Sequence, residues 1–353
     1  MSSNPTHPTR RLSRRDVVRA SAAIASGLAV TTPLIRATHA QDLTNVTLAL
    51  DWYPNANHAG IYLARDRGYF TDAGLDVEIV VPSDPTTVLQ TVGAGRDTFG
   101  ISYHSEVLFA RAQDVPVVSI AALVQHPLNS LMVLADSDIE TPADLAGKTV
   151  AVTGLPADDA FLATILDEVG LSMEDVETVN VGYDLMPAVL SGRTDAVIGV
   201  YWTHETILAE REGYPVRHFR IEEWGVPDYY ELVLVVGEST ITDDEDMVRG
   251  FLGALQQGYH DAIADPEAAI DGLLAESPDL VRDVEIEGLD LLIPLWTEDG
   301  AIPFGQQTAA RWDAFGAWLK EQDLLAADVD IASAWRGDLL PQTDPATPIA
   351  TPS

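Results

Sequence analysis

A short segment that follows the first apolar run of the chain combines flat aromatic rings with polar side chains. Its candidate ligand-binding residues are Asp51, Trp52, Tyr53, Asn55, Asn57 and His58. The rings of Trp52 and Tyr53 can stack on a planar heteroaromatic molecule. The amides of Asn55 and Asn57 can pair with the edge of such a molecule. Pro54 stiffens the segment and so lowers the entropy lost on binding. The segment predicts a binding loop, although a tryptophan can also fill a core.

Three further segments combine aromatic and ionisable residues in the same way. The candidates there are Tyr103, His104 and Glu106, then Tyr201, Trp202 and Glu205, and finally Tyr230 and Glu231. The first two segments each follow an apolar run with a central glycine, at residues 99–101 and 198–200. A glutamate placed there can accept hydrogen bonds from an amine. The alternatives are that the aromatic residues pack in a core, that the glutamates are solvated and that the lone histidines are structural.

The elements that must position these residues appear as apolar runs that alternate with helical patterns. Strands are predicted at residues 46–50, 77–81, 98–101, 115–123, 148–152, 177–181 and 196–200. Helices are predicted between them, at residues 59–67, 86–92, 105–112, 158–169, 185–190 and 203–211. This alternation predicts an α/β protein with two Rossmann-like lobes, each built on a parallel sheet. Because ligands of such sheets bind beyond the carboxyl ends of the strands, Tyr103 and Tyr201 should face one cleft.

The order of the patterns also predicts how the chain is divided. Residues 41–135 should form the first part of lobe 1, residues 136–234 lobe 2, and residues 235–338 a return to lobe 1 with C-terminal helices. The two-strand hinge between the lobes is expected at residues 134–137 and 233–237. The tail, residues 339–353, contains several prolines and is predicted to be disordered.

Residues 1–40 have the layout of an export signal. Five arginines precede a weakly charged stretch at residues 20–34, and small residues near Ala40 offer a cleavage site. Residues 13–19, SRRDVVR, resemble the twin-arginine motif, which would take the chain folded to the periplasm or the outside of the cell. The alternative is an ordinary arginine-rich start of a helix.

The composition excludes several classes of function. The chain has no cysteine, which excludes disulfides, thiolate nucleophiles and thiolate metal sites. A formal net charge of −35 argues against a nucleic acid partner. No group of histidines and carboxylates has the spacing of a metal site, so we expect neither a metal nor a cofactor.

One long run of residues is distinctive enough to suggest a family. It reads LDWYPNANHAGIYLA at residues 50–64 and is followed by RGYF at 67–70 and GLDV at 74–77. Together with DLAGK at 144–148 and GVPDYYEL at 225–232, it resembles the thiamine-pyrimidine binding-protein family over about residues 44–320. The resemblance implies a type II periplasmic-binding-protein fold, with two lobes joined by two crossing strands. It also implies a protein that passes a small heteroaromatic ligand to the membrane permease of an ABC importer, and we expect a monomer.

The ligand implied by the resemblance is a thiamine-type pyrimidine, which carries an exocyclic amine and a ring nitrogen that can be protonated. A carboxylate can accept from both groups. Glu205 is the first candidate because it follows Tyr201 within one helical turn, and Glu106, Asp51 and Glu231 are the others. A riboflavin-type ring would stack in the same way and stays open as an alternative. Relatives that bind sulfonates, nitrate or bicarbonate need a cation, and the candidate loops contain neither arginine nor lysine.

An enzyme and a sensory protein are the two alternatives to a transport protein. Fungal pyrimidine synthases share the resemblance but consume a lysine-bound cofactor and a histidine. This chain has Ser102 and Glu106 at the corresponding positions and lacks their cysteine-rich motif, so we expect no enzyme. A sensory partner of a membrane receptor would have the same cleft and export signal and stays open. In either binding role, the ligand should stabilise a hinge-closed state.

Overall fold

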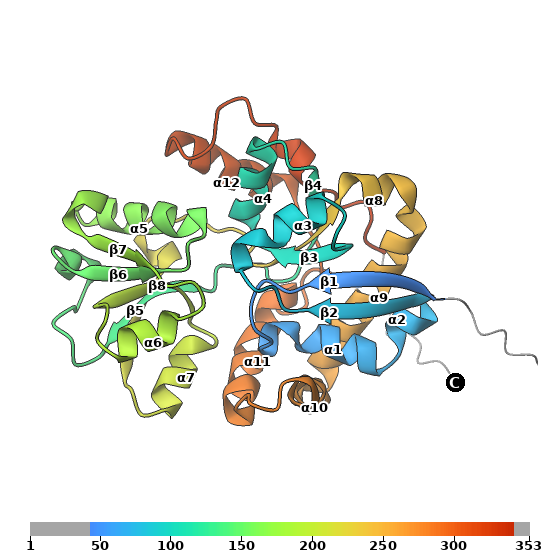
Figure 1. Ribbon diagram of the computed structural model, residues 1–353, viewed down its shortest axis with the longest axis horizontal. Coiled ribbons are helices and arrows are strands. Elements are labelled where there is room, and N and C mark those ends of the chain that lie inside the picture. The colour runs from blue at the N-terminus through green and yellow to red at the C-terminus, as the bar shows by residue number, and fades with distance from the viewer. Residues whose placement is uncertain (1–42, 342–353) are drawn as a thin grey trace, which may run out of the picture. The chain divides into compact units, whose positions relative to one another are not determined.

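Two five-stranded sheets organise the described part of the chain, which is residues 43–341 of a computed structural model (Figure 1). Their strand orders are β2-β1-β3-β10-β4 and β7-β6-β8-β5-β9. Each sheet is covered by helices, which confirms the prediction of two α/β lobes. The predicted export signal at residues 1–40 lies outside the described residues. Within residues 43–341, no helix has both the length and the apolar character needed to cross a bilayer.

The first lobe is built from two separate stretches of the chain. Its elements are β1 (Thr44–Ala49), α1 (Ala59–Asp66), α2 (Tyr69–Asp72), β2 (Leu75–Val80), α3 (Val88–Gly93), β3 (Phe99–Ser102), α4 (His104–Ala112) and β4 (Val117–Ala122), then β10 (Val233–Gly237), α8 (Glu238–Asp243), α9 (Glu245–Ala264), α10 (Pro266–Glu276), α11 (Arg282–Thr297) and α12 (Ala309–Glu321). One face of the sheet packs on α1 and α9 through residues such as Leu48 and Phe251. The other face packs on α3 and α4 through residues such as Val88 and Val107. The C-terminal helices α9 and α10 pack against α1 of this lobe.

The second lobe is a continuous stretch. Its elements are β5 (Asn129–Leu134), β6 (Thr149–Val152), α5 (Pro156–Glu168), β7 (Glu177–Asn180), α6 (Leu185–Leu190), β8 (Ala196–Tyr201), α7 (Glu205–Arg211) and β9 (Val216–Arg220). Helix α5 begins with a proline, which suits the first turn because its missing N–H would have no partner there. Apolar side chains such as Ile165 and Ile198 are fully buried between the sheet and this helix.

The prediction of parallel sheets is wrong, because both sheets are mixed. Strand β10 runs antiparallel to β3 and β4, and β5 runs antiparallel to β8 and β9. The first residue of β10, Val233, pairs with Ser102 at the end of β3, and Asn129 pairs in the same way with Tyr201. The chain comes directly from the other lobe into each of these strands. Each strand therefore begins beside the carboxyl end of its neighbour, β3 or β8. The crossing of the chain between lobes thus dictates the antiparallel direction.

The crossings lie earlier in the chain than predicted. Residues 123–128 connect β4 to β5, and residues 221–232 connect β9 to β10. The two segments run side by side, because Leu123 N–H donates to the Leu232 carbonyl at 2.8 Å and Glu231 N–H donates to the Val124 carbonyl at 3.1 Å. The predicted crossing at 134–137 is the end of β5, and the one at 233–237 is β10 itself. Lobe 2 accordingly begins near residue 129 and not at 136.

The predicted disordered tail also begins too early. Leu339 is fully buried and Leu340 nearly so, and both belong to the core of the first lobe. Burial of two leucines stabilises the fold by more than the entropy lost when the segment becomes ordered. Residues 342–353 lie outside the described residues.

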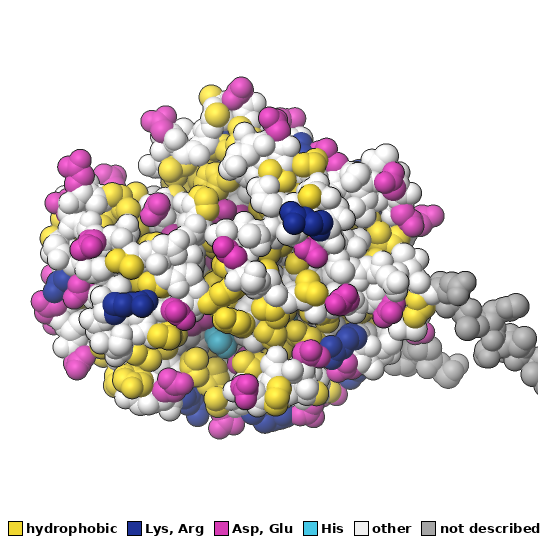
Figure 2. All heavy atoms as spheres, viewed as in Figure 1, with side chains coloured by type: hydrophobic (Ala, Val, Ile, Leu, Met, Phe, Trp, Pro, Cys, Tyr) yellow, Lys and Arg dark blue, Asp and Glu magenta, His cyan; other side chains and the backbone are white. Residues whose placement is uncertain are grey.

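Acidic side chains dominate the surface, in keeping with the net charge of −35. Figure 2 shows Asp and Glu side chains spread over the visible face, with few Lys or Arg groups among them. Charge of one sign favours solubility and does not determine the fold.

Candidate ligand-binding site

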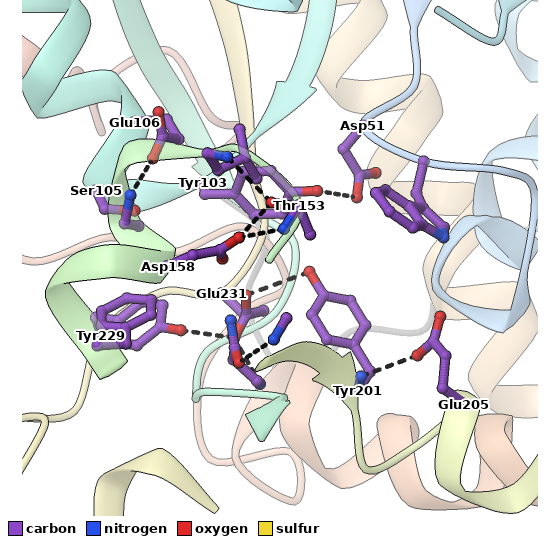
Figure 3. A pocket seen from close by; sticks show the side chains of 16 residues that line it. Asp51, Tyr103, Ser105, Glu106, Thr153, Asp158, Tyr201, Glu205, Tyr229 and Glu231 are labelled. Carbon is purple, nitrogen blue, oxygen red and sulfur yellow. Dashed lines mark hydrogen bonds between the residues drawn. The ribbon is translucent and has the colours of Figure 1, made fainter. Parts of the chain in front are cut away.

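A pocket with about 510 Å³ of empty space lies between residues of both lobes (Figure 3). Its walls are Asp51, Trp52, Tyr103, Ser105, Glu106, Asn129, Thr153, Leu155, Ala157, Asp158, Phe161, Gly199, Tyr201, Glu205, Tyr229 and Glu231. Most of these residues follow the carboxyl ends of β1, β3, β6 and β8 or begin the helices after them. The cleft expected from the ends of the strands is therefore present, and it contains seven of the predicted residues.

Asp51 is held in place by two donors in the first lobe. The Tyr103 hydroxyl donates to its Oδ2 at 3.0 Å. His58 Nε2 lies 2.9 Å from its Oδ1, and His58 Nδ1 accepts the Asn55 N–H at 3.2 Å. Because Nδ1 is an acceptor, the ring proton is on Nε2 and points at Asp51. This network fixes the loop that carries Trp52.

Glu231 is the acceptor at which the two crossings meet. Its Oε2 accepts the N–H groups of Leu128 and Asn129 at 2.7 and 3.1 Å. The Tyr229 hydroxyl donates to the same oxygen at 2.9 Å, and the Tyr201 hydroxyl donates to Oε1 at 3.2 Å. Burial raises the pKa of Glu231 to about 7, although these four donors oppose the shift.

Two carboxyl groups meet at the start of α5. Asp158 belongs to the first turn of this helix, and Glu106 reaches it from α4 of the first lobe. Glu106, at the start of α4, accepts the Ala157 N–H on its Oε1 at 3.2 Å, while its Oε2 accepts no hydrogen bond from residues 43–341. Asp158 accepts the N–H and the hydroxyl of Thr153 at 2.6 and 2.5 Å. Burial raises the pKa of Glu106 to about 8 and that of Asp158 to about 7. An amine from a ligand would stabilise either carboxylate.

Glu205 occupies the wall of the pocket that the second lobe contributes. Its Oε2 accepts the Tyr201 N–H at 2.8 Å, and its Oε1 lies 3.3 Å from His204 Nδ1. The first turn of α7 thus brings this carboxylate onto the backbone N–H of Tyr201 (Figure 3). Glu205 lines the pocket, and its role as the first carboxylate for a ligand amine stays a prediction.

Four residues of the predicted binding loop do not line the pocket. Tyr53 is 53% exposed and packs against Tyr183 with ring centres 4.6 Å apart. Asn55 and Asn57 are buried, and Asn55 caps the turn at 56–58 by accepting the Asn57 N–H at 2.9 Å. His58 holds Asp51. The polar side chains of this segment accept hydrogen bonds from backbone N–H groups of the turn, which would otherwise lack acceptors.

Three other predicted residues face away from the pocket. His104 is fully buried against Trp312, with ring centres 3.9 Å apart, and burial lowers its pKa. Trp202 donates from its indole nitrogen to the Pro127 carbonyl at 3.2 Å and lies under the guanidinium of Arg220. Tyr230 is buried, and its hydroxyl accepts the Thr308 N–H at 2.8 Å. Each neighbours a residue that does line the pocket, and adjacent side chains point in different directions.

The lining residues that sequence reasoning missed lie mainly in the second lobe. They are Ser105, Asn129, Thr153, Leu155, Ala157, Asp158, Phe161, Gly199 and Tyr229. The end of β6 is a strand end like those of β1, β3 and β8, and it could have indicated Asp158 in the same way. This residue is in the first turn, and it also faces the pocket. Asn129 gave no signal because β5 was not predicted.

The pocket has a clear chemical character. Five of its residues are carboxylic acids, four carry aromatic phenol or indole rings, and no arginine or lysine lines it. Within residues 43–341, no group of three or more histidine, aspartate and glutamate side chains is arranged to hold a metal ion. The arrangement can stack a flat ring and accept hydrogen bonds from it.

Comparison with known proteins agrees with this organisation. The family model described as NMT1/THI5 like matches residues 55–269. The formylaminopyrimidine-binding protein of Halalkalibacterium halodurans is 38% identical over 81% of this chain and 88% of that protein. The 4-amino-5-hydroxymethyl-2-methylpyrimidine phosphate synthase of Legionella pneumophila is 28% identical over 85% of this chain and 93% of that protein. Among solved structures, the alkanesulfonate-binding protein SsuA of Xanthomonas axonopodis pv. citri bound to MOPS has a TM-score of 0.67 at 19% identity, covering 83% of this chain and 98% of that chain.

These matches decide both the fold and the class of protein. The solved structure shows a type II periplasmic-binding-protein fold, as predicted. The binding protein, at 38% identity, is more similar to this chain than the synthase, at 28%. The protein is a binding protein and not an enzyme. By the match over residues 55–269 and the 38% identity to a relative, the chain belongs to the NMT1/THI5-like family.

Proposed function

We propose that the protein is the extracytoplasmic solute-binding protein of an ABC importer and that it captures a thiamine-precursor pyrimidine between its lobes. The observation that carries the proposal is the chemistry of the pocket, which offers aromatic faces and carboxylates without any cation. A ligand of this pocket must bring hydrogen-bond donors and must not be an anion. An aminopyrimidine meets both conditions.

The tyrosine hydroxyls of the pocket already donate within the protein. The hydroxyls of Tyr103, Tyr201 and Tyr229 all donate to carboxylates. What the carboxylates offer a ligand is acceptor capacity, above all Oε2 of Glu106. The exocyclic amine and a protonated ring nitrogen of an aminopyrimidine can donate to such oxygens, while its ring stacks on Trp52 or Tyr103. The 38% identity to a formylaminopyrimidine-binding protein supports the same class of ligand.

The runner-up ligand, riboflavin, fits the pocket less well. Its ring system also stacks, but the edge of a flavin carries two carbonyl oxygens. The N3–H between them can donate, but the two carbonyl oxygens cannot pair with ionised carboxylates, and placing these acceptors together costs free energy. The proposed partners are therefore a small pyrimidine and a membrane permease, and we propose that the binding protein is exported and acts as a monomer. The predicted export signal and the relation to binding proteins support this location.

Calorimetric titration tests the proposal. The protein is titrated with 4-amino-5-hydroxymethyl-2-methylpyrimidine, with its formylamino counterpart, with riboflavin and with an alkanesulfonate as the anionic control. We expect a pyrimidine to bind with a Kd well below about 1 mM, which corresponds to about −4 kcal/mol, and the sulfonate not to bind. Tighter binding of the sulfonate or of riboflavin would overturn the ligand class.

A further inference from the structure

A chain of ionisable groups leads from the pocket across the junction of the lobes. It starts at Glu205, which lines the pocket and whose Oε1 lies 3.3 Å from His204 Nδ1. The other nitrogen of His204, Nε2, lies 3.1 Å from Oε1 of Glu285 in α11 of the first lobe. Glu285 Oε2 accepts the Ala56 N–H at 2.7 Å. The chain therefore ends in the segment that follows Trp52.

The two carboxylates on either side of His204 define its protonation state. The side chains of Glu285, Glu205 and His204 are 1%, 10% and 13% exposed. His204 Nε2 is hydrogen bonded to Glu285, whereas Nδ1 lies near Glu205 as a charge contact without hydrogen-bond geometry. The imidazolium pairs by charge with both carboxylates. Burial lowers the pKa of His204, but Glu205 and Glu285 outweigh burial and raise it to about 10.

The backbone brings the two lobes close enough for this contact. Gly288 lies one turn after Glu285 in α11, and a Cβ atom there would stand 2.6 Å from the carbonyl oxygen of Thr203. Glycine thus permits α11 to approach the residue that precedes His204. The next charged pair on these helices, Arg211 and Glu287, is joined at 2.5 Å but is about half exposed. The two ion pairs at one junction differ in burial and in contact with the pocket.

We propose that Glu285 is a positioning residue for the pocket, which acts through His204 to hold the Glu205 carboxylate toward the ligand. The proposal rests on the proposed function, because it takes Glu205 as a ligand contact. Glu205 and His204 belong to the second lobe and Glu285 to the first, so the chain is complete only when the lobes meet. Ligand affinity is thereby coupled to closure, since only the closed state adds His204 and Glu285 to the Tyr201 N–H that already holds Glu205 within the second lobe.

A double-mutant cycle tests this coupling. The Kd for 4-amino-5-hydroxymethyl-2-methylpyrimidine is measured by calorimetry for the wild type, Glu285→Gln, Glu205→Gln and the double variant. Glu287→Gln is the matched control, because it breaks the neighbouring ion pair between the same helices. We expect Glu285→Gln to weaken binding about tenfold, Glu287→Gln to change it less than about twofold, and Glu285→Gln to have no further effect once Glu205 is replaced. Additive losses in the cycle would overturn the proposal.

A second measurement does not depend on any ligand. Nitrogen NMR of the ligand-free protein, with the His204 signal assigned from His204→Gln, reports the protonation of the imidazole. We expect it to stay protonated at about pH 8 in the wild type and in Glu287→Gln, and to lose its proton at lower pH in Glu285→Gln. A wild-type imidazole that titrates near its ordinary pKa would overturn the positioning role. A protonated imidazole in a protein that binds no pyrimidine would instead overturn the proposed function alone.

Discussion

Replacement of Glu231 by alanine should destabilise the protein more than any other single change in the pocket. Two backbone N–H groups, from Leu128 and Asn129, and two tyrosine hydroxyls donate to this carboxylate, which is 2% exposed. An unsatisfied buried donor costs about 1–3 kcal/mol, and water from the adjacent pocket can satisfy some of the four. The groups left behind are neutral, so two donors that water does not reach would together cost about 2–6 kcal/mol. We expect the free energy of unfolding to fall by that amount.

Urea unfolding of the ligand-free protein at neutral pH measures this loss, and Glu231→Gln is the matched control. The amide oxygen of glutamine can keep the three hydrogen bonds of Oε2. Its NH₂ group can donate to the Tyr201 hydroxyl, which can turn to accept. The glutamine variant should therefore lose no more than about 1 kcal/mol. Equal losses in the two variants, or a loss below about 1 kcal/mol for alanine, would refute the idea that Glu231 joins the crossings.

Two further changes test the aromatic wall and the raised pKa values. Trp52→Ala removes an indole that lines the pocket, so a pyrimidine should bind about tenfold more weakly by calorimetry, while Trp202→Phe, outside the pocket, should leave the affinity unchanged. A matching loss of thermal stability in ligand-free Trp52→Ala would instead make Trp52 a core residue. Burial raises the pKa of Glu106 from 4.5 to about 8, so its contribution to stability is complete below 4.5 and is lost as the pH rises through 8. Asp158 and Glu231 also have raised pKa values, so urea unfolding should show the wild type losing up to about 5 kcal/mol more than Glu106→Gln between about pH 5 and pH 9. Identical losses would contradict the raised pKa.

The sequence predicts those elements whose side chains are buried on a regular period. The strands around Gly100 and Gly199 and the helices that follow them are close to their predicted places, because apolar runs bounded by glycine turns are typical of buried strands. The edge strand β9 was missed, since Val216–Arg220 contains two arginines and a histidine and is largely accessible. The missed strand β5 follows β4 after only six residues, so its apolar run is hard to separate from the previous one. That single omission displaced the hinge and the boundary of lobe 2.

The site was predictable to the extent that it follows from the ends of the strands. Asp51, Trp52, Tyr103 and Tyr201 were found in this way, and all line the pocket. The direction of individual side chains could not be predicted. Tyr229 faces the pocket, but its neighbour, Tyr230, bonds to Thr308 on the other side. Neither hydropathy nor spacing distinguishes the two, because the difference arises from where the crossing meets α12.

The ligand class depends on the lining and not on the fold. The same fold in SsuA holds a sulfonate, MOPS, and the present pocket has the opposite chemistry, with five carboxylic acids and no cation. Transfer of an anion into such a pocket would place like charges together at low dielectric, whereas an amine donor relieves the desolvated oxygens. A ring that is already cationic in solution should stabilise the ionised form of Glu106 and lower its pKa on binding. Binding should then release protons at about pH 7, which calorimetry in buffers of different ionisation enthalpy can measure. Net exchange close to zero would show instead that the carboxyl keeps its proton beside a neutral ring or passes it to the ring nitrogen.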